Sequence, residues 1–207
     1  MNARNTQIQA GSKDAWLDAA YTVLTQNGVD AVKIMTLARL TGLTRTGFYW
    51  HFKDRADLLE AMVQRWEQHN TGNLVARTEL PAQTITEAML NLFDCWLDAS
   101  LFDAPLDLAI RNWARNDSDL KARLDRADKQ RINAIAGIFV RFGHSRVQAQ
   151  VRAMSVVYTQ IGYISMQVDE SNQQRLTQVP HYVEVFTGHA PGAAEIAAFR
   201  ARHQEKD

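Results

Sequence analysis

The chain has 207 residues, of which 46% are hydrophobic, so it is long enough and apolar enough for one small and one larger globular domain. Its 23 basic and 23 acidic residues cancel, which argues against the broad nucleic-acid affinity of a strongly basic protein. The charge is unevenly distributed, because residues 1–55 carry seven basic and four acidic residues. This mild excess of positive charge indicates that residues 1–55 are the part of the chain most suited to bind a polyanion.

Cysteine content and hydropathy favour a cytoplasmic protein. Cys95 is the single cysteine, which excludes an intramolecular disulfide framework and fits a reducing compartment. The first sixteen residues contain no apolar segment of the kind found in secretory signals. The longest uncharged stretch, residues 153–168, is sixteen residues long and contains several polar residues. We therefore expect no contact with a membrane.

The first predicted helix covers residues 12–27. Asn27 followed by Gly28 is typical of a helix C-terminus. The apolar residues recur at helical spacing and are Trp16, Ala19, Ala20, Val23 and Leu24.

Residues 33–52, KIMTLARLTGLTRTGFYWHF, predict two short helices joined by a turn. Gly42 supplies a backbone position that turns without a Cβ clash, and Thr44 offers a hydroxyl N-cap for the second helix, over residues 44–51. Phe48 and Phe52, four residues apart, share its buried face. The opposite face is largely polar and thin enough to enter a DNA major groove about 12 Å wide. It consists of Arg45, Thr46, Gly47, Tyr49 and His51.

A further helix is predicted from Ala56 to Trp66, with Asp54 as its N-cap. Its apolar stripe consists of Leu58, Leu59, Met62, Val63 and Trp66.

Residues 15–66 resemble the N-terminal domain of the TetR/AcrR (tetracycline-repressor) family of bacterial transcription regulators. The stretch LARLTGLTRTGFYWHFKDRADLL carries the resemblance, chiefly through its aromatic pair, the following His-Phe-Lys and the later Leu-Leu. The resemblance covers about a quarter of the chain. It implies a double-stranded palindromic operator as partner, a homodimer, and no cofactor or metal.

The resemblance also assigns roles to residues. It implies base contacts for Arg45, Thr46 and Gly47, backbone contacts for Tyr49 and His51, and phosphate contacts for Lys53 and Arg55. The full predicted DNA-binding set is Lys33, Thr44, Arg45, Thr46, Gly47, Tyr49, Trp50, His51, Lys53 and Arg55.

Arg45 is the leading candidate for base reading, because its planar fork matches guanine O6 and N7. A phosphate contact or a solvated charge is the alternative for this side chain. Tyr49, Trp50 and His51 are open to a second interpretation as an aromatic cluster at a domain junction. Lys33 and Met35 depart from the family pattern at the start of the first short helix, so a base contact from that helix is not expected.

From about residue 66 onward, the chain predicts successive helices without internal repeats. They cover residues 84–101, 105–114, 117–142 and 145–168, and a further one lies around 179–186. Leu108 and Trp113 are the expected apolar residues of the helix at 105–114. Val140 is the last residue of the apolar second half of the helix at 117–142. We therefore predict an all-α protein with a helix-turn-helix domain over residues 1–55 and a helical ligand-binding and dimerisation domain over 56–207.

The helix at 145–168 carries two apolar seams and therefore needs two packing partners. One seam is heptad-like, and the other, which includes Ala153 and Tyr163, has mixed polarity. The second partner of this helix is either another subunit, in an isologous dimer, or a neighbour in a monomeric bundle. The predicted dimer residues are Val151, Met154, Tyr158, Ile161 and Val168.

The resemblance further implies a small-molecule effector held in the C-terminal domain. The candidate pocket residues are Phe93, Trp96, Trp113, Phe139, Tyr158 and Tyr163, with Gln160, Asn112 and His144 as polar candidates. The alternative for each aromatic residue is ordinary core packing.

A helical-bundle enzyme and an architectural DNA-binding protein are the two alternatives to a ligand-responsive regulator. A helical-bundle enzyme would show a metal-binding Glu-x-x-His pair, a nucleophile elbow or a phosphate-binding glycine loop, and the sequence contains none of these. An architectural DNA-binding protein without an effector would have a filled core and many genomic sites. The sequence therefore favours a ligand-responsive repressor that is not an enzyme.

Overall fold

The computed structural model describes residues 12–204, and over this range the chain is helical without strands. The predicted all-α class is confirmed. Residues 1–11, most of the stretch inspected for a secretory signal, lie outside the described range. None of the helices within 12–204 has the length and apolar character needed to cross a membrane.

The contacts divide the chain into two compact units. The first contains residues 1–67 and 105–122, and the second contains residues 68–104 and 123–207. The chain therefore passes three times between them. The domain boundary predicted at residue 55 falls inside the first unit, so the division into 1–55 and 56–207 remains a prediction.

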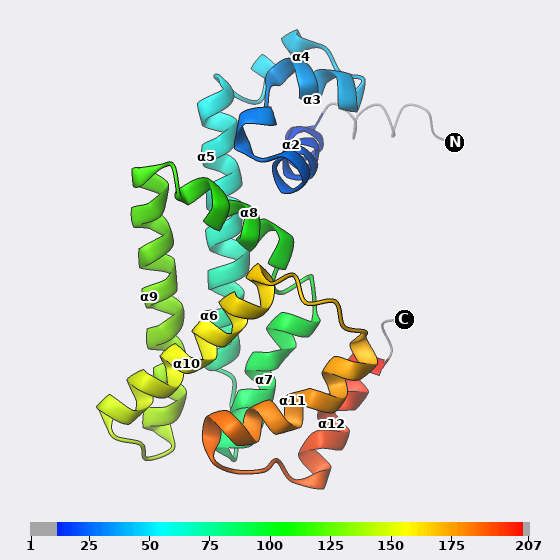
Figure 1. Cartoon of the computed structure of the whole chain (residues 1–207). Helices are drawn as coiled ribbons and strands as arrows, with labels where there is room; N and C mark the ends of the chain where they lie inside the picture. Colours follow the sequence, from blue (N-terminus) through cyan, green and yellow to red (C-terminus); the bar gives the residue numbers. More distant parts are fainter. Residues whose placement is uncertain (1–11, 205–207) are drawn as a thin grey trace. The chain divides into compact units, whose positions relative to one another are not determined.

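Four helices at the N-terminus belong to the first unit: α2 (Lys13–Asn27), α3 (Ile34–Thr41), α4 (Arg45–Tyr49) and α5 (Arg55–Trp66) (Figure 1). A 3-10 turn, Val29–Ala31, joins α2 to α3. Local chemistry sets their ends, because Ser12 accepts a hydrogen bond from the backbone N–H of Ala15, and Asp54 accepts one from that of Asp57. All five predicted apolar residues of α5 are buried.

Aromatic residues form the core of these four helices. Trp16 and Phe48 are completely buried and meet edge to face, with ring centroids 5.2 Å apart. Phe52 lies beside Phe48 at 5.4 Å. The predicted burial of both phenylalanines is confirmed, and it fixes which face of α4 is left for solvent.

Helix α8 (Ala104–Ala114) contributes residues 105–114 to the first unit and is held against the end of α5 by a buried carboxylate. Asp107 Oδ1 accepts a hydrogen bond from Trp66 Nε1 at 2.8 Å, and Asp107 Oδ2 accepts one from Arg111 Nε at 2.7 Å. Leu106 and Ile110 lie on the same buried face of α8 as Asp107. Leu108 and Trp113, the apolar residues named for this helix from the sequence, are both half-buried.

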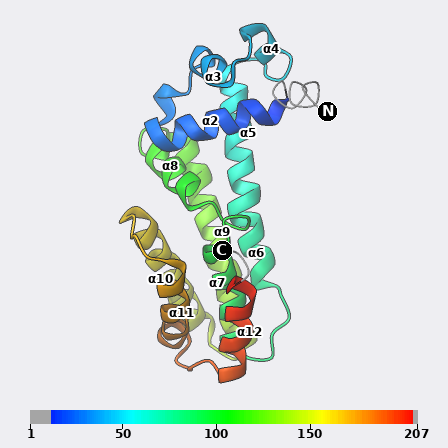
Figure 2. The same ribbon diagram turned by 90° about the vertical axis from the view of Figure 1, so that its right-hand side faces the viewer.

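The second unit is built around α7 (Ile85–Leu97), which contacts α6 (Asn73–Thr78), α11 (Asn172–Thr187) and α12 (Ala193–Gln204); Figure 2 shows α12 beside α7. A π-helical segment, Glu67–Gly72, leads into α6. Helix α9 (Ser118–Arg141) runs from the first unit into the second, and α10 (Arg146–Ser165) packs on α11.

Helix α7 ends four residues before its predicted end at Leu101. Asp98 leaves the helical conformation, with φ −120° and ψ 107°, and its side chain accepts a hydrogen bond from the backbone N–H of Ser100 at 2.9 Å. A short aspartate turn thus competes with the helix. The chain can then continue to α8.

Helix α12 is fastened to α7 by buried polar groups. Asp94 of α7 accepts hydrogen bonds from His203 Nε2 at 2.8 Å and from Arg202 of the same helix, and Arg77 of α6 lies on its other oxygen at 3.3 Å. Glu195, at the start of α12, accepts hydrogen bonds from the hydroxyls of Thr84 and Thr86. Both ends of the C-terminal helix are therefore anchored to the centre of this unit.

Burial keeps the Cys95 thiol neutral, because desolvation, partly offset by the nearby Arg77 charge, raises its pKa from 9.0 to about 12. We expect Cys95 in the folded protein to react with a disulfide reagent at pH 8 on the order of 1000-fold more slowly than in the urea-denatured chain, since the thiolate is the nucleophile. Absorbance of the released thiol measures both rates. Equal rates would show that the thiol is accessible and ionised in the fold.

Candidate nucleic-acid interface and internal pocket

The turn between α3 and α4 has the geometry that its sequence predicts. Gly42 adopts φ 70° and ψ 13°, a left-handed conformation that favours glycine. Thr44 then caps α4, and its hydroxyl accepts a hydrogen bond from the backbone N–H of Gly47 at 3.1 Å. Helix α4 ends at Tyr49, and a turn rather than helix continues through His51. The second helix is therefore shorter than predicted.

The exposed residues of α4 and the turn after it are Arg45, Thr46, Tyr49 and Trp50, whereas Phe48 is buried. Trp50 is 82% exposed, which is unusual for so large an apolar side chain. Arg45 lies over the Tyr49 ring, 5.6 Å from its centroid, and donates a hydrogen bond to the Tyr49 hydroxyl at 3.2 Å. We call these four residues the α4 face. It holds an oriented guanidinium beside two exposed aromatic rings.

Exposed lysines lie in the chain on both sides of the α4 face. Lys33 is the N-cap residue of α3, and Lys53 follows the turn after α4; the side chains of both are exposed. Lys13 was not predicted, although its ammonium lies 5.3 Å from the Phe52 ring centroid and thus next to the end of that turn. The sequence signal for Lys13 is weak, because a lysine in a first helical turn usually has no role beyond solubility.

Arg55 has a contact that the sequence analysis did not foresee. Its Nε and Nη2 donate hydrogen bonds to the backbone carbonyls of Val32 and Val29, both at 2.6 Å. Two of its nitrogens therefore hold the loop between α2 and α3 onto α5. Arg55 thus has a structural role, and its predicted role as a phosphate ligand stays a prediction. His51 is half-buried.

These N-terminal elements match a known family. Residues 17–62, which contain α3, α4 and most of α2 and α5, match the model of the "Bacterial regulatory proteins, tetR family". The N-terminal helices are therefore similar to this family over residues 17–62, which we call the TetR domain. The predicted resemblance is confirmed for this domain.

Individual relatives agree with this assignment. The chain is 36% identical over 75 residues to the HTH-type transcriptional regulator AcrR of Shigella flexneri, an alignment covering 35% of this chain and 34% of AcrR. It is 33% identical over 75 residues to the HTH-type transcriptional regulator TtgR of Pseudomonas putida, covering 36% of this chain and 35% of TtgR. The chain thus matches about a third of the length of these curated relatives.

The fold of the whole chain also has a solved counterpart. The fatty acid degradation regulator FadR of Bacillus halodurans superposes with a TM-score of 0.61 at 14% identity, over 84% of this chain and 94% of FadR. At this level of identity the likeness concerns the fold. The helical fold thus has a solved counterpart over 84% of the chain.

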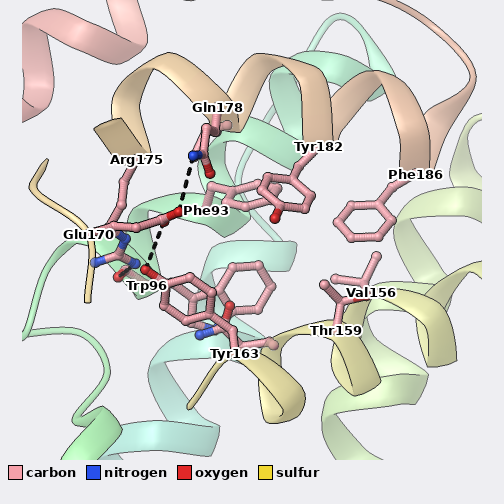
Figure 3. A pocket seen from close by; sticks show the side chains of 12 residues that line it. Phe93, Trp96, Val156, Thr159, Tyr163, Glu170, Arg175, Gln178, Tyr182 and Phe186 are labelled. Atoms are coloured by element: carbon pink, nitrogen blue, oxygen red, sulfur yellow. Dashed lines mark hydrogen bonds between the residues drawn. The ribbon is translucent and has the colours of Figure 1, made fainter. Parts of the chain in front are cut away.

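Beyond the TetR domain, a pocket of about 470 Å³, part of it open to solvent, lies among α7, α10 and α11 (Figure 3). Five of its twelve lining residues are aromatic, and polar groups gather near the loop that joins α10 to α11. The lining residues are Phe93, Trp96, Val156, Thr159, Gln160, Tyr163, Glu170, Arg175, Gln178, Val179, Tyr182 and Phe186.

Three of the predicted pocket residues, Phe93, Trp96 and Tyr163, lie together at this pocket, as does Gln160. Tyr158 does not, because it lies five residues before Tyr163, about 140° around α10, and is 60% exposed. The predicted placement of Tyr158 in the pocket is therefore corrected.

Two further predicted aromatics also lie elsewhere. Trp113 belongs to the first unit, where its Nε1 donates a hydrogen bond to Asp117 at 3.1 Å. Phe139 is completely buried and packs edge to face with His144, at 5.4 Å between ring centroids. Phe139 is thus a core residue and Trp113 is half-buried, and neither Asn112 nor His144 lines the pocket.

Helix α11 supplies the pocket residues that the sequence analysis missed. Tyr182 and Phe186 stack at 6.1 Å, and both lie near Phe93 of α7, at 6.4 Å. Their spacing of four residues is the signal that could have identified them. Arg175 and Gln178 are on the same helix, and their place at the pocket depends on how α11 packs against α7.

The polar end of the pocket is organised around Glu170, just before α11. Its two carboxylate oxygens accept hydrogen bonds from the Tyr163 hydroxyl and from Gln178 Nε2, each at 3.1 Å. Burial raises the pKa of Tyr163, and the bond to Glu170 raises it further against the opposing charge of Arg175. The phenol therefore keeps its proton and remains a hydrogen-bond donor to Glu170.

A second exposed surface lies on α10 and α11. Val147 and Val151 of α10 are 76% and 53% exposed, and Val185 of α11 is 75% exposed. Together with Tyr158 we call them the outer face. Of the other residues predicted at a subunit interface, Val168 is exposed, and Met154 and Ile161 are half-buried.

Proposed function

We propose that this chain is a DNA-binding transcriptional regulator that recognises a short palindromic operator as a homodimer. The observation that carries the proposal is the α4 face within the matched TetR domain, an exposed guanidinium, hydroxyl and aromatic surface on a capped short helix. Such a helix can enter the major groove, while flanking lysines meet phosphates. The two curated relatives are named transcriptional regulators, which supports the same activity rather than catalysis.

The outer face supports the proposed dimer. Isolated exposed valines need no explanation, but here three valines and a tyrosine occur on two adjacent helices. Pairing α10 and α11 with the same helices of a second subunit would cover these side chains in a four-helix bundle. Two identical heads could then read half-sites about 34–36 Å apart.

The pocket supports a response to a small molecule. It lies between α10 and α11, the two helices that carry the outer face, so a ligand that changes their packing can change how two subunits meet. Such a ligand lowers operator affinity only if it binds the non-DNA-binding arrangement more tightly. We therefore propose that the protein is a ligand-responsive repressor. We also propose that it acts in the cytoplasm. A pocket lined by both aromatic and polar side chains also favours an effector-controlled regulator over an architectural protein with a filled core.

Recovery of bound fragments from the source genome by the purified protein tests this function. Salt near 0.15 M suppresses non-specific phosphate binding. We expect enrichment of a few palindromic sites near one or two promoters. Hundreds of dispersed sites would indicate the architectural alternative, and the absence of any enrichment would contradict the proposal.

Arg45→Ala is expected to weaken binding to the recovered operator by about 1–3 kcal/mol, because it removes the guanidinium and with it a bidentate base contact. The affinity for random DNA should stay nearly unchanged. Lys53→Ala is its matched control, since loss of a phosphate contact weakens binding to all DNA and lowers the salt slope by about one. Fluorescence anisotropy at several salt concentrations measures both. Equal losses on operator and random DNA for Arg45→Ala would remove Arg45 as a base reader.

A further inference from the structure

The two charged residues of the pocket both contact Tyr163, and each also has a partner of its own. Arg175 donates a hydrogen bond to the backbone carbonyl of Trp96, in the last turn of α7, where the helix dipole is negative. Its guanidinium also lies over the Tyr163 ring, 5.5 Å from the centroid. The positive charge is thus already matched by a helix end and by an aromatic face.

Glu170, in contrast, is held only by neutral donors. The Tyr163 hydroxyl and the Gln178 amide orient its carboxylate without cancelling its charge. Within residues 12–204 no lysine, arginine or histidine forms an ion pair with it. Because a partly enclosed carboxylate attracts positive charge more strongly than one in bulk water, the polar end of the pocket favours a cation.

The apolar end of the pocket favours a flat partner. Phe93, Tyr182 and Phe186 are tilted by only 21° to 31° from one another, with centroids 6.1 to 6.4 Å apart. Figure 3 shows Tyr182 and Phe186 on the side of the pocket away from Glu170 and Arg175. Aromatic faces stack on planar rings and also attract cations.

We propose that this pocket binds a flat, largely apolar organic cation, with its positive charge against Glu170 and its rings on the aromatic wall. This assigns a ligand class to the effector site and rests on the proposed function. The ligand bridges α7, α10 and α11, so its occupancy bears directly on the two helices of the outer face.

Calorimetric titration with three matched probes tests the ligand class without DNA. The probes are naphthylmethyl-trimethylammonium, which is cationic, naphthylmethanol, which is neutral, and naphthylacetate, which is anionic. We expect the cation to bind at least tenfold more tightly than either of the others. Tighter binding of the acetate, equal binding of all three, or binding of none would overturn the proposal.

Substitution of Glu170 tests whether this carboxylate binds the cationic group of the ligand. Glu170→Gln keeps a carbonyl acceptor and is expected to weaken cation binding about tenfold while changing the affinity for naphthylmethanol less than twofold. Glu184→Gln is the matched control, because Glu184 is an exposed glutamate of α11 outside the pocket lining. Equal weakening by the two variants would overturn the role of Glu170. The selectivity of the unmodified protein tests the ligand class even if Glu170→Gln does not fold.

The fragment recovery separates this inference from the proposed function. Enriched operators with no cation selectivity would leave a regulator whose ligand belongs to another class. Cation selectivity without enriched DNA would leave the binding site and remove the regulator.

Discussion

Val151→Glu is expected to convert the proposed dimer into monomers, raising the dimer dissociation constant at least about 100-fold, equivalent to roughly 3 kcal/mol. Val151 is 53% exposed on a single subunit, so its own fold tolerates a carboxylate there. In an isologous interface the new charge lies near its own symmetry copy in an apolar environment and cannot be hydrated. Analytical ultracentrifugation over a range of concentrations measures the change.

Operator binding should fall together with dimerisation, because a monomer loses the second half-site. Val140→Glu is the matched control. Val140, on α9, is 47% exposed and lies outside the outer face, so this variant should remain dimeric. An unchanged dimer for Val151→Glu would displace the interface from α10 and α11.

Asp94→Ala is expected to lower the free energy of unfolding by about 3–5 kcal/mol, because it removes one partner of a buried charge network. Asp94 is 3% exposed, and its loss leaves His203 buried without its acceptor and Arg77 without its counter-charge. Urea denaturation followed by circular dichroism measures the effect. Asp169→Ala, at an exposed aspartate in the loop after α10, should change stability by less than 0.5 kcal/mol, as is usual for surface substitutions.

The position of Asp94 also predicts where the damage begins. Arg202 and His203 connect α12 to α7 through this carboxylate, so amide hydrogen exchange should accelerate first in α12. Unchanged protection of α12 would show that other contacts hold the C-terminal helix. A loss below about 1 kcal/mol would show that the network adds little to stability.

The starts of several helices, and the buried faces of the TetR domain, could be predicted from the sequence alone. Thr44, Asp54 and Ser145 cap their helices through hydrogen bonds that reach only three residues along the chain. The turn at Gly42 follows from the conformational freedom of glycine at that one position. Burial of Phe48 and Phe52 follows from helical spacing. Such features depend on near neighbours in the chain, which the sequence displays directly.

The pocket could be predicted only in part, because its membership depends on which helices meet. Tyr158 and Tyr163 belong to the same helix and look equally suitable in sequence, yet the packing of α10 on α11 leaves one exposed and places the other at the pocket. Tyr182 and Phe186 became pocket residues through contact with Phe93, more than 80 residues earlier. No local pattern encodes that distance.

The sequence by itself determined the helical class, the helix caps and the DNA-binding candidates, since these depend on residue type and short spacing. Only the tertiary structure decided that Arg55 binds the backbone at Val29 and Val32, and that Glu170 stands at the pocket held by neutral donors. It also decided that α12 is anchored on Asp94. The physical reason is the same in each case: a charged side chain takes its role from groups brought near it by packing, and those groups are distant in the chain.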